Sequence, residues 1–227
     1  MRKLLFLFIT LLSCWLVHGQ TKTPAVKFVA SVNGSNIQMN TWMSLANGKD
    51  SIYMTKLKYY LTDLQLTDKG QKIRQSIPDV LLLDFDSSLP LLPDVSDAFD
   101  QLSFKLGIDS AIQSSGALEG ELDPLKGMYW TWQSGYIHFK LEGMIHEADG
   151  KTKNIILHLG GYRSPNNSVK KVDLLSQHLH RHFSLELDLS DLIQQIISNN
   201  IFHIMSPGKE AVELSELISQ SFKIHNG

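Results

Sequence analysis

Residues 129–163, YWTWQSGYIHFKLEGMIHEADGKTKNIILHLGGYR, hold the pattern that decides the fold. Apolar and polar side chains alternate on both sides of Asp149-Gly150, a dipeptide that is typical of tight turns between antiparallel strands. The stretch therefore predicts a β-hairpin whose two strands meet at that turn. Its first half also carries Trp130 and Trp132. Large aromatic side chains of this kind commonly fill the core between two sheets.

Other short stretches of the chain repeat the alternation that is typical of β-strands. The clearest are residues 25–34, 51–70, 79–86, 101–109 and 177–189. Short strands separated by turn residues favour an all-β fold, an antiparallel β-sandwich with Greek-key-like connections, over a parallel α/β sheet. Residues 192–200 and 208–222 have helical periodicity, so one or two short helices are expected near the C-terminus.

The first residues have the layout of a secretory signal peptide. Two basic residues precede a short apolar run, and Gly19 ends a segment suited to cleavage. The run is too short to span a bilayer. We therefore expect a signal peptide over 1–19, one domain over 20–227, and a periplasmic or extracellular protein without a membrane span. The alternative is a lipid anchor at Cys14, although the apolar residues after it suit a tether poorly.

Composition excludes several classes of protein. Cys14 is the only cysteine, so a chain cleaved after Gly19 has no disulfide and depends on core burial or a bound ion. The net charge is -2 at pH 7 and no basic cluster is present, so nucleic acid is not an expected partner. The chain has no G-x-S-x-G elbow, no H-E-x-x-H helix and no glycine-rich phosphate loop, so we expect a protein that is not an enzyme.

Histidines supply the candidate metal ligands. His178, His180 and His182 alternate along one predicted strand, where two neighbouring imidazoles are placed to share a zinc or copper ion. The alternative is a solvated face of an edge strand. His138 lies in the aromatic stretch and His158 in an apolar one. Each is either a metal ligand or a buried histidine that bonds the protein itself.

The segment 107–128 is rich in glycine, serine and acidic residues. A connection of this length without secondary structure is usually functional. Its carboxylates are oxygen donors of the kind that bind calcium, but their spacing fits no EF-hand loop. A solvated loop is therefore the favoured interpretation of the acidic residues.

The chain resembles the MbnP-like family of exported copper-binding proteins, which is named for a member encoded beside methanobactin genes. The resemblance rests on the L-D-P…G-M-Y-W-x-W-x-S-G-Y…K-L-E-G run at 122–143 and on H-L-G at 158–160. Weaker similarity covers most of the remaining chain. Membership implies a secreted or periplasmic β-sandwich-like domain. It also implies copper held by histidine and by a tryptophan that a partner haem enzyme oxidises to kynurenine.

The resemblance carries over to particular residues. His158 matches the histidine of H-L-G, and Trp130 and Trp132 match the W-x-W pair. In copper-binding members a histidine lies in the preceding loop, whereas residues 111–116 here read AIQSSG. The cysteine that follows H-L-G in those members is also absent. We therefore predict a copper site at His158, Trp130 and Trp132, with His138 or the His178 to His182 tract in place of the missing ligand.

Two hypotheses about function follow from this resemblance. The first is a non-catalytic copper-binding protein with a haem-containing oxidase as its partner. The second is a structural or partner-recognition module on the same fold that has lost the copper site. In the second hypothesis the tryptophans pack the core and the segment 107–128 binds the partner.

Overall fold

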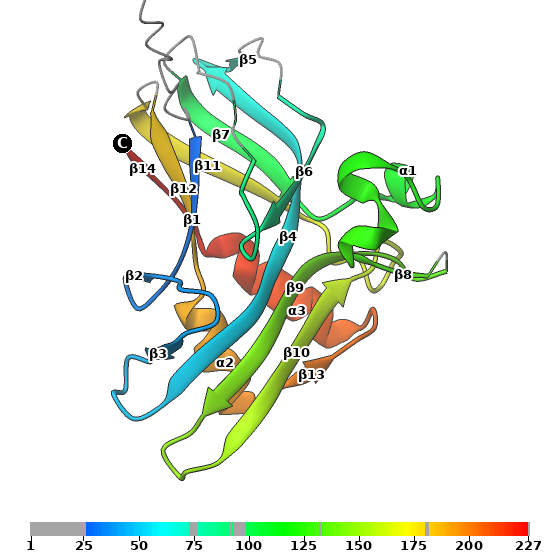
Figure 1. The fold of residues 1–227 in the computed structure, drawn as a ribbon. Coiled ribbons are helices and arrows are strands. Elements are labelled where there is room, and N and C mark those ends of the chain that lie inside the picture. Colours follow the sequence, from blue (N-terminus) through cyan, green and yellow to red (C-terminus); the bar gives the residue numbers. More distant parts are fainter. Residues whose placement is uncertain are drawn as a thin grey trace, which may run out of the picture.

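The computed structural model describes residues 26–72, 77–90, 92, 99–131, 133–179 and 182–226 (Figure 1). The predicted signal peptide and Cys14 lie outside these residues, as do Trp132 and His180. The division into a signal peptide over 1–19 and a domain over 20–227 therefore stays a prediction. No helix in the described part of the chain is long and apolar enough to cross a membrane.

Two β-sheets make up most of the structure. The larger sheet has the order β11 (Lys170–Leu179), β7 (Phe99–Leu106), β4 (Ser51–Asp68), β9 (Gly135–His146), β10 (Thr152–Gly160) and β13 (His203–Ile204). Four short strands pair with β4 or β9: β3 (Trp42–Ser44), β5 (Gln71–Lys72), β6 (Val80–Asp84) and β8 (Tyr129–Thr131). The smaller sheet has the order β14 (Phe222–Asn226), β12 (Phe183–Asp188), β1 (Val26–Val32) and β2 (Ser35–Asn36).

The predicted hairpin of residues 129–163 is the β9–β10 pair. Its strands are antiparallel, with Leu141 opposite Leu157. The turn closes through a hydrogen bond of 2.8 Å from the Glu147 N–H to the Lys151 carbonyl. Gly150 adopts a φ of 84°, a left-handed conformation that glycine reaches without steric cost. The alternation of side chains and one turn dipeptide thus predict a strand pair that belongs to the larger sheet.

The β-rich class is confirmed, but the prediction of a purely antiparallel order is wrong. β1 and β12 are parallel, with Val26 opposite Phe183. β10 and β13 are also parallel, with Ile156 opposite His203. Alternation shows which face of a strand is buried, but not which distant strand lies beside it. Both sheets are therefore mixed.

The main core lies between the two sheets and two helices, α2 (Ser190–Asn199) and α3 (Lys209–Gln220). The helices confirm the prediction of short helices near the C-terminus. α3 contacts both β10 and β11, which lie toward opposite edges of the larger sheet. That sheet therefore curls around the helix (Figure 1).

A second, smaller core lies under the segment 107–128. The buried residues that share it are Tyr60, Leu82, Ile108, Leu122, Met128, Tyr136 and Ile137. Tyr59 and Tyr60 follow each other in β4 but belong to different cores, so the two cores occupy opposite faces of the strand. The segment itself contains α1 (Ser110–Gln113) and the short 3-10 helices η1 (Gly120–Leu122) and η2 (Pro124–Lys126). It is a folded cap, and we call residues 107–128 the cap below.

Candidate functional site

The described candidate residues lie on three neighbouring strands. His138 is in β9, His158 is in β10 and Trp130 is in β8. Lys140, and not His138, lies directly opposite His158 in the ladder. The two histidines also have different hydrogen-bond partners, so each has its own environment.

His138 is the extra residue of a β-bulge. Where β10 advances by one residue from Leu159 to Gly160, β9 passes from Phe139 to Ile137. The residue between them has no counterpart in β10, and such a bulge locally re-aims side chains. His138 is 1% exposed, and burial lowers its pKa to about 3. Its imidazole is therefore neutral at physiological pH.

Hydrogen bonds fix the tautomer of this buried ring. Gln113 Oε1 accepts the Tyr136 N–H at 2.8 Å, which orients the amide so that its Nε2 faces His138 Nε2 at 2.8 Å. An amide nitrogen only donates, so His138 Nε2 accepts and Nδ1–H donates to Ser168 Oγ at 3.0 Å. Ser168 then donates to the Gly161 carbonyl at 3.3 Å. Both ring nitrogens therefore bond protein atoms, and a metal at either would have to replace one of these bonds.

Glycine is required behind the His138 ring. A Cβ on Gly107 would lie 2.7 Å from His138 Cγ, and the residue adopts a φ of 104°. Its carbonyl accepts a hydrogen bond of 2.8 Å from Thr62 Oγ1. Gly107 thus ties the start of the cap to β4 through Thr62, and Gln113 ties it to β9 through His138 and Tyr136.

Replacing Gln113 with alanine is expected to lower the free energy of unfolding by about 2 kcal/mol, because it leaves His138 Nε2 and the Tyr136 N–H buried without partners. Urea denaturation measures the loss. Gln195, an exposed glutamine of α2, provides the matched control. Its replacement with alanine should change stability by less than about 0.5 kcal/mol. Equal effects of the two substitutions would contradict this account of the cap.

His158 has one satisfied nitrogen and one that bonds nothing. Its Nε2 lies 2.7 Å from Glu142 Oε1. Burial raises the pKa of Glu142, but the His158 hydrogen bond and the Lys140 charge outweigh burial and hold that pKa below its usual value. An ionised carboxylate only accepts, so Nε2 carries the proton. Nδ1 is buried and has no partner among the described residues.

The imidazole of His158 is neutral because its pKa lies below the usual value. Burial lowers its pKa, and the charges of Lys140 and His203 lower it further, against the opposing effect of Glu142. Nδ1 therefore presents an unshared lone pair. This is the form of histidine that binds transition metals.

Trp130 lies beside the same face of β10. Gly160 and His158 are two residues apart in the strand and so point to one side. A Cβ on Gly160 would lie 2.8 Å from Trp130 Cζ3, so the indole ring fills that space. The Trp130 Nε1–H is also buried and has no partner among the described residues. His203 lies on this side too, because it pairs with Ile156.

The predicted histidine strand of residues 177–189 is not continuous. β11 ends at Leu179 in the larger sheet, and β12 begins at Phe183 in the smaller one. His178 therefore belongs to β11, and His182 lies just before β12. A strand that changes sheets keeps its alternation, so the sequence pattern did not reveal the break.

Sequence reasoning missed Glu142, His203 and Gln113 as neighbours of the candidate residues. Glu142 lies in the K-L-E-G part of the family motif, which was a usable signal, whereas His203 and Gln113 stand in no pattern. Within the described ranges, no three His, Cys, Asp or Glu side chains come together in a group that could hold a metal ion. A complete set of such ligands is therefore not assembled there.

Comparison with known proteins gives the family. The family model of MbnP matches residues 21–206. The solved structure of MbnP from Methylosinus trichosporium is similar, with 19% sequence identity and a TM-score of 0.48, over 74% of this chain and 76% of that chain. No curated protein matches the chain. Because the family model covers most of the sequence, the chain belongs to the MbnP family.

Proposed function

We propose that this member of the MbnP family is an exported, non-catalytic copper-binding protein of sandwich-like β fold. The observation that carries the proposal is the His158 ring, which donates Nε2–H to Glu142 and keeps a bare, buried Nδ1. Histidines that bind metals almost always donate their other nitrogen to a carboxylate, a carbonyl or water. In this proposal the protein works in the periplasm or outside the cell.

The residues present fit copper in donor type. His158 Nδ1 would hold the ion, and Glu142 would orient the ring and keep its proton on Nε2. Neutral imidazole is a suitable ligand for copper. The indole of Trp130 would keep water from that side of the ring. Bound copper would supply a redox-active metal centre, or a cargo for transfer.

The remaining ligands of the proposed site are assigned by family position. Trp130 and Trp132 occupy the W-x-W positions and are the candidates for oxidation by a haem-containing partner. His138 remains a candidate ligand, at the expense of its bond to Gln113 or Ser168.

The test is copper loading of the purified protein under anaerobic conditions, with Cu(I) and Cu(II) in separate experiments. We expect uptake of copper and a rise in the thermal unfolding temperature, because a ligand of the native state stabilises it. The His158→Gln variant should lose this binding. Glu142→Gln should weaken it by about 10- to 100-fold, as loss of a carboxylate behind a metal-binding histidine does.

His146→Gln is the matched control, because His146 is an exposed histidine of the same strand as Glu142. It should bind copper like the unchanged protein. Absence of copper uptake, or unchanged affinity in His158→Gln, would overturn the proposal. Loss of binding in His138→Gln alone would move the site to His138.

A second candidate function is partner recognition by the cap. Leu125 is 93% exposed and Leu118 is 37% exposed, whereas both nitrogens of His138 are engaged within the protein. Both leucines belong to the cap, where their exposed side chains are available for contact with a partner. A protein whose unfolding temperature is unchanged by copper would favour this function over the first.

A further inference from the structure

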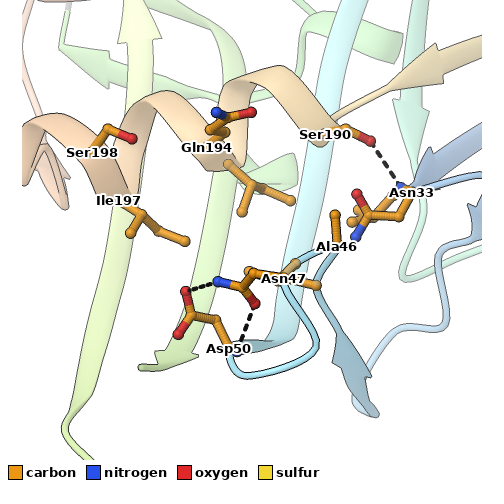
Figure 2. A pocket seen from close by; sticks show the side chains of 11 residues that line it. Asn33, Ala46, Asn47, Asp50, Ser190, Gln194, Ile197 and Ser198 are labelled. Carbon is orange, nitrogen blue, oxygen red and sulfur yellow. Dashed lines mark hydrogen bonds between the residues drawn. The ribbon is translucent and has the colours of Figure 1, made fainter. Parts of the chain in front are cut away.

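A cavity of about 350 Å³ lies between α2 and the loop that joins β3 to β4. Figure 2 shows Gln194, Ile197 and Ser198 of α2 on one side and the loop with Ala46 and Asn47 on the other. A volume of this size lies within the range of small-molecule sites. We call this cavity the α2 groove. It lies apart from His158 and contains none of the candidate copper ligands.

Hydrogen bonds hold both walls of the α2 groove in place. Asn47 Nδ2 donates to Asp50 Oδ2 at 2.6 Å, and Asn47 Oδ1 accepts the Asp50 N–H at 2.9 Å. Across the groove, the Asn33 N–H donates to Ser190 Oγ at 2.8 Å, which ties the start of α2 to the turn after β1. Figure 2 shows these bonds at the edges of the cavity. The groove is therefore formed without a ligand, as binding sites usually are.

The described lining offers no positive charge to an anionic ligand. None of the described residues that line it is Lys, Arg or His. Its one carboxylate, Asp50, is 8% exposed and uses both oxygens, since Oδ1 also accepts the Ala148 N–H at 2.7 Å. An anion would lose hydration there without gaining a counter-charge. A cation would find the one carboxylate largely buried and already hydrogen-bonded through both oxygens. The α2 groove therefore favours uncharged ligands.

The rest of the lining is divided between apolar and neutral polar groups. Val32, Leu45, Ile193 and Ile197 supply the apolar surface. Three neutral polar side chains also line the groove, those of Asn33, Gln194 and Ser198. An amide or hydroxyl both donates and accepts. We propose that the α2 groove binds a small uncharged molecule that has an apolar body and an amide or hydroxyl edge.

Four probes with one aromatic ring and different charge test this proposal. Benzamide and benzyl alcohol are neutral, benzoate is an anion and benzylammonium is a cation. Binding is followed by saturation-transfer NMR and by shifts of the backbone amide signals. We expect the neutral probes to shift the signals of residues 46–48 and 194–198. The two ions should bind at least about tenfold more weakly than the neutral probes, because the hydration that they lose is not replaced.

Substitutions that fill the groove separate specific from surface binding. Ala46 and Ser198 are exposed residues that line the cavity from the loop and from α2, so Ala46→Trp and Ser198→Trp should each abolish the shifts. Ala111→Trp in α1, at another exposed alanine, is the matched control and should retain them. Thermal unfolding confirms that each variant folds. Equal binding of all four probes, no binding of either neutral probe, or undiminished binding in both groove variants would overturn the proposal.

Discussion

Replacing Gly143 with alanine is expected to lower the free energy of unfolding by about 3 kcal/mol or more. A Cβ at this position would collide with the carbonyl oxygen of Tyr53 and lie 3.1 Å from Met54 Cα. Both atoms belong to the backbone of β4, so no side-chain rotation relieves the clash. β4 and β9 would have to separate at the middle of the larger sheet.

The matched control is Gly208→Ala. A Cβ there would meet nothing within 4 Å, and the extended backbone of Gly208, with a φ of -179°, suits any residue. Loss of a glycine N-cap costs less than about 1 kcal/mol. Guanidinium denaturation of both variants measures the difference. If Gly143→Ala proved as stable as the control, the close approach of the two strands would not be a constraint on the sequence.

The second large effect is a loss of stability in acid that depends on His138. Its pKa is about 3 in the folded state, against an ordinary value of 6.5. The unfolded chain therefore takes up a proton first as the pH falls below 6.5. The free energy of unfolding should fall by about 1.4 kcal/mol per pH unit in this range. The contribution of His138 is fully present above pH 6.5 and is lost as the pH falls through about 3, for a total of about 5 kcal/mol.

Comparison with His138→Gln isolates this contribution from that of the carboxylates. The variant should be less stable near neutral pH, because its bonds to Gln113 and Ser168 are weaker or absent. Its stability should fall less steeply between about pH 6 and pH 4, because glutamine has no proton to gain. Denaturation of both proteins across this range supplies the two slopes. Parallel curves would show that His138 does not titrate on unfolding.

Local pattern predicted the parts of the fold that depend on neighbouring residues. The β9–β10 hairpin follows from alternation on either side of Asp149-Gly150, and α2 and α3 follow from helical periodicity. The pairing of Val26 with Phe183 does not. Partners so far apart in sequence are chosen by how the whole chain packs, and an alternating strand fits several neighbours equally well.

The same limit applies to the candidate site. His158 was found from its family position, but its bond to Glu142 depends on the register between β9 and β10. Gln113 stands in the loop where the sequence lacked an expected histidine. Its contact with His138 depends on a bulge of one residue, and alternation of apolar residues does not show such an insertion.

The smaller sheet cannot form until a late part of the chain is available, because β1 pairs with the distant strand β12. β1 leaves the ribosome early, but its neighbour β12 begins only at Phe183, and β14 closes the sheet at Phe222–Asn226. Pairings across most of the sequence form slowly, because a long loop must close first. The edge of β1 that pairs with β12 therefore stays without its partner strand until Phe183–Asp188 has been made. For a protein that we propose to be exported, this delay keeps the chain incompletely folded, and so able to pass through a secretion pore, until β12 has been made.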